Sequence, residues 1–303
     1  MNAVIERFLQ YLGLERNLSK GTVALYRRNL KQWCDYMCAG GQELDVASVT
    51  VGDLRTWLME RSIQGDCPGT LRHKAQALRA FYRYLLRRGV VSVNPAAQVE
   101  LAKLPKPLPK FVRENTVDSV IDAQYDGKDF VGVRDRLIVM LFYETGIRLS
   151  ELIGLQDSAV DTVKCELKVH GKRDKDRIVP FGAELASAID HYRSLRAEQC
   201  PQCGHLLVTG RGKPLYASLV YHVVHDSLSE AGGTGKLSPH VLRHTFASTM
   251  LNHGAQLNSV KELLGHESLA ATQVYTHVTL SELQHNYELA HPRALKKGGY
   301  YGS

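Results

Sequence analysis

Residues 103–110 read Lys-Leu-Pro-Lys-Pro-Leu-Pro-Lys, and this segment most strongly constrains how the chain can fold. Its prolines stand at alternate positions, which excludes a helix and favours an extended, semi-rigid linker. Its lysines, Lys106 among them, could follow a phosphate backbone. Since 303 residues are enough for two domains, we predict one domain over residues 1–102 and a second over residues 111–303.

Positive charge is concentrated in the first third of the chain. The net charge is +7, but residues 1–110 carry 17 lysines and arginines against 9 acidic residues, whereas residues 111–303 carry 21 against 22. A charge excess confined to one part of a chain is typical of a module that binds a polyanion. A basic surface that serves only solubility is the alternative for the charge alone.

The predicted first domain is helical, and its clearest helix covers residues 71–85. Apolar residues recur there at helical spacing: Leu71, Ala75, Leu78, Tyr82 and Leu85. A polar stripe follows one position further along, formed by Arg72, Gln76, Arg79 and Arg83. We expect this second stripe to contact DNA, with a solvated basic face as the alternative. Another helix is expected to begin after Ser19, which is a favourable N-cap residue.

The cysteines and the apolar runs indicate a cytoplasmic protein. Six cysteines at irregular spacings in a long chain predict reduced thiols rather than a disulfide framework. No apolar run reaches 18 residues, so no membrane span is expected, and the N-terminus lacks the apolar stretch of a signal peptide. Cys200 and Cys203 resemble half of a zinc knuckle, but no second pair follows, so we expect a surface loop without metal.

The predicted second domain is mostly helical with one β-hairpin. A helix near residues 115–123 precedes an apolar helix over residues 133–145, which Gly146 ends. Ser150 is positioned to cap the next turn. Alternating apolar residues around a turn rich in glycine and aspartate predict a hairpin over residues 166–181.

A run of basic and aromatic residues near the C-terminus carries the chemistry. A serine–proline pair at positions 238–239 predicts a helix start, which places His240 and Arg243 on one face of a turn that favours anions. His266 is expected on a turn, and Tyr275 lies nine residues further along. A phenol with a pKa of about 10 is a poor nucleophile, but arginines can stabilise the phenolate and a histidine can accept its proton. For Tyr275 alone, a half-buried structural tyrosine is the alternative.

Several strings together resemble the tyrosine recombinase, or phage-integrase, family and its Xer-type members. They are Thr145-Gly146-Ile147-Arg148-Leu149-Ser150-Glu151-Leu152, Gly171-Lys172, His240-Val241-Leu242-Arg243-His244, Leu263-Leu264-Gly265-His266 and Tyr275-Thr276-His277. The resemblance extends to Leu18-Ser19-Lys20 in the first domain, where Lys20 would contact DNA. It implies a mainly α, C-shaped clamp of two domains, in which a SAM-like helical bundle binds core DNA and a catalytic domain contains a small sheet.

The resemblance implies six catalytic residues: Arg148, Lys172, His240, Arg243, His266 and Tyr275. The two arginines would hold the non-bridging oxygens of the scissile phosphate. Lys172 would protonate the departing 5′ oxygen, and the two histidines would complete the site, with His240 accepting the proton. Tyr275 would form a 3′-phosphotyrosine link, so no metal, cofactor or ATP is expected. Glu151 could orient an arginine or be an exposed first-turn acid, and His244 could buttress Arg243 or be an ordinary helix histidine.

The implied function is site-specific recombination of double-stranded DNA. Four protomers would act on two duplexes through a Holliday junction, in the resolution of chromosome or plasmid dimers. A paralogous recombinase could share the site, and a cell-division DNA translocase could activate it. The alternatives are a mobile-element integrase, a type IB-like topoisomerase and a non-catalytic DNA-binding protein. The amphipathic segment after Tyr275, with Leu283 and Leu289, is expected to dock on a neighbouring protomer.

Overall fold

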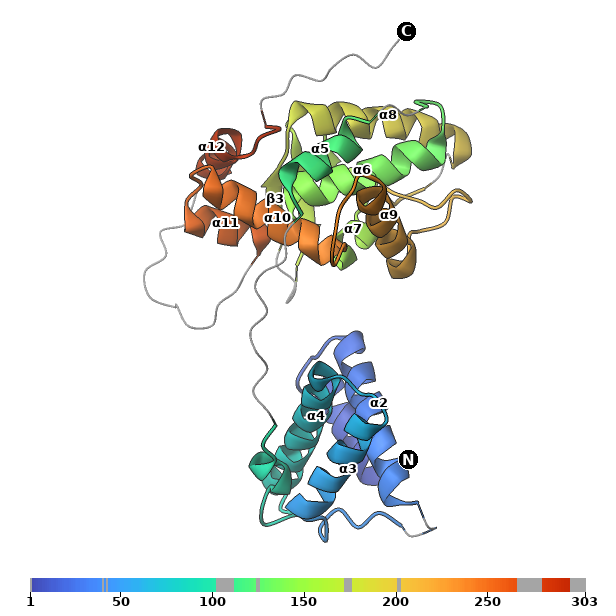
Figure 1. Ribbon diagram of the computed structural model, residues 1–303, viewed down its shortest axis with the longest axis vertical. Helices are drawn as coiled ribbons and strands as arrows, with labels where there is room; N and C mark the ends of the chain where they lie inside the picture. Colours follow the sequence, from blue (N-terminus) through green and yellow to red (C-terminus); the bar gives the residue numbers. More distant parts are fainter. Residues whose placement is uncertain are drawn as a thin grey trace. The chain divides into compact units, whose positions relative to one another are not determined.

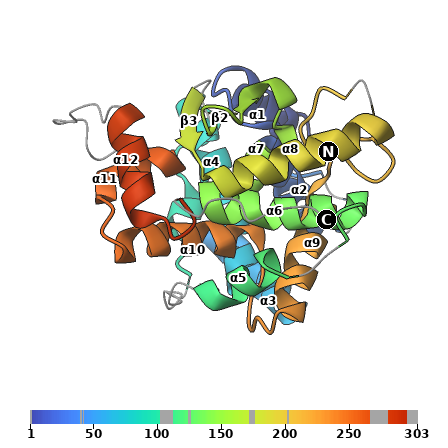
Figure 2. The ribbon, with the colours of Figure 1, turned by 90° about the horizontal axis from the view of Figure 1, so that it is seen from above.

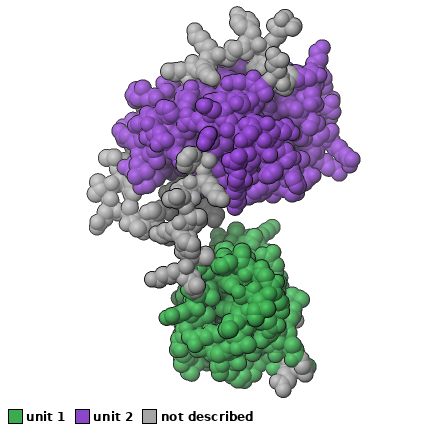
Figure 3. Space-filling view, in the orientation of Figure 1, with its two compact units in different colours: residues 1–107 green, residues 108–303 purple. Residues whose placement is uncertain are grey.

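The chain divides into two compact units, residues 1–107 and residues 108–303 (Figure 3). The hydrophobic core of each unit shares no residue with that of the other. The predicted linker and its Lys106 lie outside the residues that the structure describes. The computed structural model describes residues 2–39, 41, 43–101, 112–123, 126–171, 176–200, 203–265 and 280–294.

The described part of the first unit is helical, as the sequence predicts (Figure 1). The helix that starts after Ser19 is confirmed, since the Ser19 side chain accepts a hydrogen bond from the backbone N–H of Thr22. Thr50 and Asp53 cap the third helix reciprocally. The elements are α1 (Ala3–Leu14), α2 (Lys20–Met37), α3 (Val51–Ile63), α4 (Pro68–Arg87) and the 3-10 helix η1 (Pro95–Gln98).

The core of the first unit forms where the apolar faces of its helices meet. Trp33 of α2 and Trp57 of α3 are almost fully buried, and Trp33 contacts the rings of Phe81 and Tyr82 on α4 edge-on. The predicted apolar stripe of α4 is confirmed, because its members from Ala75 onward are at most 2% exposed. Burying a large apolar side chain contributes roughly 1.5–3 kcal/mol, so this stripe fixes which face of α4 points outward.

The second unit is mostly helical, with a small sheet (Figure 1). None of the helices in the described ranges combines the length and apolar character needed to cross a membrane. The helices are α5 (Glu114–Ile121), α6 (Phe130–Thr145), α7 (Leu149–Gly154), η2 (Asp157–Ala159), α8 (Ala183–Gln199), α9 (Ala217–Glu230), α10 (Pro239–Asn252), α11 (Leu257–Leu264) and α12 (Leu280–Ala290).

Helix α6 is the centre of the second unit. It runs between α8 and α10 (Figure 2), and every residue from 137 to 145 is at most 1% exposed. A helix that is apolar on all sides is stable only where other elements surround it. Its start differs from the prediction, since Asp129 caps a helix that begins at Phe130 rather than near Val133. Its end at Gly146 is as predicted.

The predicted hairpin is confirmed as part of a three-stranded antiparallel sheet. Strands β2 (Glu166–His170) and β3 (Asp176–Pro180) pair along their length, and β1 (Val160–Asp161) adds a short edge. The sequence missed β1 because two residues are too few to show an alternating pattern. The turn at residues 172–175 lies outside the described ranges.

Helix α12 packs on its own unit, and its docking on a neighbouring protomer stays a prediction. It contacts α10, α11 and β3. Leu283 and Tyr287 are 7% and 1% exposed, whereas Leu289 is 69% exposed. The Tyr287 ring also stacks on His291, with 5.0 Å between the ring centroids. The amphipathic pattern therefore predicted correctly that one face of this helix is buried. In this structure that face packs against the same chain.

Candidate active site

The turn between α6 and α7 places Arg148. Gly146 adopts a left-handed conformation with φ 58°, and a Cβ atom there would collide with Phe246 and approach Leu264 Cδ2 to 2.9 Å. Glycine is therefore required for this close approach of the turn to α10 and α11. Arg148 follows in an extended conformation at the N-cap of α7. This corrects the prediction for Ser150, which lies inside α7 instead of capping it.

Glu151 holds Arg148 in place. Its Oε1 accepts a hydrogen bond from Arg148 Nη1 at 2.7 Å, and its Oε2 accepts one from the Arg148 backbone N–H at 2.7 Å. Burial alone would raise the pKa of Glu151, but hydrogen bonds from Arg177 and Arg148 outweigh it and lower the pKa to about 2. Two interpretations of Glu151 were an acid that orients an arginine and an exposed acid in the first helical turn. The structure favours the first, because Glu151 is buried and binds Arg148.

Arg243 is buried beside Arg148. It is 8% exposed, and its Nη1 and Nη2 donate to the carbonyl oxygens of Gly146 and Leu264, each at 2.5 Å. Arg148 Nη2 donates to the carbonyl oxygen of Gly265 at 2.8 Å. Burial and the neighbouring Arg148 lower the pKa of Arg243 to about 10, which keeps it charged at neutral pH. The end of α6 and the end of α11 thus hold two guanidinium groups together.

The predicted helix start at Ser238 and Pro239 is confirmed, and it exposes His240 on the first turn of α10. Partial burial, followed by the charges of His244 and Arg243, lowers the pKa of His240. A neutral imidazole at this position can accept a proton. His244 is exposed, and no hydrogen bond joins it to Arg243 within the described ranges, so its buttressing role finds no support.

Three of the predicted catalytic residues lie outside the described ranges: Lys172, His266 and Tyr275. Their neighbours in the chain are described. Strands β2 and β3 flank the segment with Lys172, and Gly265 ends α11 directly before His266. The structure therefore brings together Arg148 and Arg243 and places His240 on the helix that carries Arg243.

Arg177 is a site residue that the sequence did not reveal. It lies on β3, and its Nη1 and Nη2 donate to the two oxygens of Glu151 at 2.9 and 2.8 Å. Its Nε donates to the carbonyl oxygen of Leu263 at 2.7 Å. The available signal was a basic residue at the second position of the strand after the hairpin turn, but a strand pattern does not tell which helix an arginine reaches.

The predicted DNA-binding residues of the first unit lie mostly on its surface. Exposed side chains are Lys20, Arg72, Gln76 and Arg83. Arg79 is half-buried, and its Nε and Nη2 donate to the carbonyl oxygens of Ala96 and Val99 at 3.2 and 2.5 Å. This arginine ties α4 to the segment around η1, and its contact with DNA stays a prediction.

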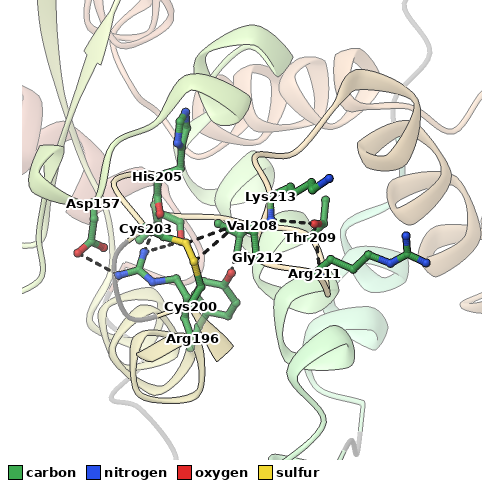
Figure 4. Close-up of a disulfide and its surroundings, with 12 residues drawn as sticks. Asp157, Arg196, Cys200, Cys203, His205, Val208, Thr209, Arg211, Gly212 and Lys213 are labelled. Atoms are coloured by element: carbon green, nitrogen blue, oxygen red, sulfur yellow. Dashed lines mark hydrogen bonds and ion pairs between the residues drawn. A yellow bond between two sulfur atoms is a disulfide. The ribbon is translucent and has the colours of Figure 1, made fainter. Parts of the chain in front are cut away.

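A disulfide joins Cys200 and Cys203 after α8, next to Arg196, which pairs with Asp157 (Figure 4). The prediction of reduced thiols is therefore wrong for this pair. Irregular spacing along a whole chain says nothing about two cysteines that a loop brings together locally. The remaining cysteines of the described ranges, Cys34, Cys38, Cys67 and Cys165, are free. Across these ranges, no three His, Cys, Asp or Glu side chains are grouped as they would be around a metal ion.

Curated relatives resemble the chain over almost all of its length. The tyrosine recombinase XerC of Listeria innocua serovar 6a is 38% identical over 293 residues, which cover 95% of this chain and 97% of the relative. The tyrosine recombinase XerC of Mycobacterium sp. (strain JLS) is 37% identical over 303 residues, which cover 97% and 100%.

Solved structures and family profiles also match recombinases and integrases. The XerH recombinase bound to difH covers 88% of this chain and 90% of its own, with a TM-score of 0.67 at 19% identity. The Tn1549 transposon integrase with circular intermediate DNA covers 93% and 98%, with a TM-score of 0.68 at 19% identity. These two show a shared fold. The Phage integrase family profile matches residues 110–282, and that of the phage integrase N-terminal SAM-like domain matches residues 5–89. The chain therefore belongs to the phage integrase family of tyrosine recombinases.

Proposed function

We propose that this site-specific DNA recombinase resolves chromosome or plasmid dimers in the cytoplasm. Its close relatives are named XerC, which supports a housekeeping role over mobile-element integration. We propose one active site composed of Arg148, Lys172, His240, Arg243, His266 and Tyr275. The observation that carries this site is the pair of guanidinium groups of Arg148 and Arg243, both held by carbonyl oxygens at the ends of α6 and α11.

The reaction exchanges one phosphoester for another. Tyr275 Oη attacks phosphorus and the bond from phosphorus to the 5′ oxygen breaks, which leaves a 3′-phosphotyrosine and a 5′-hydroxyl. His240 accepts the phenol proton and Lys172 supplies one to the departing oxygen. Arg148 and Arg243 bind the non-bridging oxygens, where negative charge increases in the transition state. A 5′-hydroxyl from the partner duplex then reverses the reaction and exchanges strands.

Strand exchange between two duplexes requires four cleavages, which supports an assembly of four protomers. A lambda integrase of related fold has been solved as a tetramer bound to a Holliday junction. A paralogous recombinase that shares the DNA site and a cell-division DNA translocase are further proposed partners. A type IB-like topoisomerase would relax supercoils without forming a junction, so junction formation separates the two functions.

A nicked suicide duplex tests the proposed chemistry. Footprinting on the host's replication-terminus DNA first locates the binding site. Cleavage next to a nick releases a short strand, so the covalent intermediate cannot be reversed and accumulates. We expect the wild-type chain to become linked to a 3′ end, and Tyr275→Phe to form no covalent complex while it binds the duplex with unchanged Kd.

Tyr216→Phe is the matched control, because Tyr216 is 56% exposed at the start of α9 and has no proposed role. It should cleave at the wild-type rate. A covalent complex formed by Tyr275→Phe, or none formed by the wild-type chain, would overturn the proposed chemistry. Protection of mobile-element ends alone would overturn the proposed role in dimer resolution.

A further inference from the structure

The carboxylate of Glu151 accepts hydrogen bonds from two guanidinium groups of the proposed active site. Glu151 is bound by Arg148 through one side-chain nitrogen and the backbone N–H, and by Arg177 through both Nη atoms. The side chains of Glu151 and Arg177 are 4% and 12% exposed, whereas that of Arg148 is 28% exposed. Arg177 is therefore the inner partner of the carboxylate, and Arg148 is the one that faces outward.

Arg177 also changes the charge that the site offers to a phosphate. Without it, Arg148 and Glu151 would form a neutral pair, and Arg243 would remain as the single uncompensated charge among these residues. With it, Arg148 and Arg243 are both left uncompensated. A phosphodiester carries one negative charge, and attack by a phenolate adds a second in the transition state. Charge matched to the transition state is the usual source of the largest rate effect in such sites.

The position of Arg177 fastens three parts of the second unit to one another. It lies on β3. It forms an ion pair with Glu151 in the first turn of α7 and donates a hydrogen bond to the carbonyl oxygen of Leu263 at the end of α11. It also fills the space beside Gly265, where a Cβ atom would lie 3.3 Å from Arg177 Nη1. Its contacts therefore adjoin the chain segments that lead to the proposed catalytic residues Lys172 and His266.

We propose that Arg177 is a positioning residue for strand cleavage. It neutralises and orients Glu151, so that the guanidinium of Arg148 is both aimed at the scissile phosphate and left with its full positive charge. The proposal rests on the proposed function, because it assigns Arg148 to the phosphate. Arg177 itself touches no substrate.

Two versions of the suicide duplex separate this role from a merely structural one. One carries the natural phosphodiester, and the other carries a methylphosphonate, in which a methyl group replaces a non-bridging oxygen and removes its charge. We expect Arg177→Gln to slow single-turnover cleavage of the phosphodiester by about 10- to 100-fold, below the ~10²–10³ typical of losing a direct donor. The methylphosphonate needs less positive charge, so its cleavage should be slowed much less.

Arg177→Lys keeps the positive charge that Arg177→Gln removes, but it cannot form the bidentate hydrogen bonds to Glu151. Its phosphodiester cleavage rate should fall between those of the wild-type chain and Arg177→Gln, and the three rates should converge on the methylphosphonate. The double variant Glu151→Gln, Arg177→Gln removes the carboxylate charge as well. It should cleave the phosphodiester faster than Arg177→Gln alone, which a structural role does not predict.

Arg196→Gln is the matched control. Arg196 is also buried in the second unit, where it pairs with Asp157 and donates to the carbonyl oxygens of His205 and Leu206. It should lower thermal stability without changing the ratio of the two cleavage rates. Equal slowing of Arg177→Gln or Arg177→Lys on both duplexes, or a double variant no faster than the single one, would overturn the proposal. If the wild-type chain formed no covalent complex, the proposed function itself would fail.

Discussion

Two buried glutamates, seven positions apart in sequence, have pKa values shifted in opposite directions. Glu151 accepts hydrogen bonds from Arg148 and Arg177, and its pKa falls to about 2. Glu144 is fully buried, and burial followed by the nearby charge of Glu184 raises its pKa to about 8. Hydrogen bonds from Gly182 N and Tyr287 Oη, at 3.3 and 3.4 Å, are too few to offset that cost. The guanidinium partners, and not depth alone, decide whether a buried carboxyl is charged.

This difference predicts a pH dependence of stability. Glu144 would ionise near pH 4.5 in the unfolded chain but near pH 8 in the folded chain. Between these values the folded state binds the extra proton, so Glu144 makes the free energy of unfolding fall as pH rises, by at most about 1.4 kcal/mol per pH unit. Buried His291, whose pKa falls to about 3, contributes a slope of opposite sign up to its ordinary pKa of 6.5, so we expect the fall above that pH. There Glu144→Gln should remove the fall and be more stable than the wild-type chain at pH 8. Denaturant titrations from pH 6.5 to 9 measure it.

Glu230→Gln is the control for this measurement, since Glu230 is exposed at the end of α9. It should keep the wild-type slope. The same slope in Glu144→Gln would show that another group causes the dependence.

Motif spacing predicted Arg148 and Arg243, and the structure places them together. Motif spacing could not predict the contacts of Arg79, because the carbonyl groups that this arginine binds belong to Ala96 in η1 and to Val99 just after it, 17 and 20 positions away. Arg177 was missed for the same reason, since its acceptors lie 26 and 86 positions away in sequence.

Helix ends position the site at the level of elements. Gly146 and Gly265 both adopt left-handed conformations, and each ends a helix with a carbonyl oxygen that accepts a hydrogen bond from a proposed active-site arginine. The stop at Gly146 was predicted from the sequence, because glycine at a helix end has a specific backbone cause. The face of α12 was readable too, but its partner was not, since an apolar stripe can be buried in the same chain or in another one.

The disulfide after α8 predicts a modest redox effect on stability. Reducing the bond between Cys200 and Cys203 should lower the free energy of unfolding by about 2 kcal/mol or less, because it closes a very short loop. Cleavage of the suicide duplex should not change, since no proposed catalytic residue lies in this loop. Denaturation with and without dithiothreitol measures the effect, and a variant with serine at both positions should not respond. Unchanged stability on reduction would contradict a structural role for the bond.

At the scale of the whole molecule, the residues that the structure describes form two separate hydrophobic cores. One is built around Trp33, Trp57 and Phe81, and the other surrounds α6. Two domains of this size, each with its own core, are expected to unfold independently.

Calorimetry should therefore show two unfolding transitions. A fragment of residues 1–101 should fold alone and reproduce one of them, and a fragment of residues 112–303 should reproduce the other. A single cooperative transition of the full chain, or a first fragment without helical circular dichroism, would contradict independent cores.

The first fragment should bind duplex DNA with an affinity that falls steeply with salt, because its excess charge is positive.

The sequence by itself determined the helices, the hairpin, the proline-rich break and the family, because each depends on local periodicity, backbone chemistry or motif spacing. Tertiary structure alone decided that Glu151 is shared by Arg148 and Arg177, that buried Glu144 accepts hydrogen bonds from a backbone N–H and a phenol, and that Arg79 binds the carbonyl oxygens of Ala96 and Val99. These features depend on contacts between residues far apart in the chain. Local patterns fix which residues point inward, but only the packed fold fixes what they meet there.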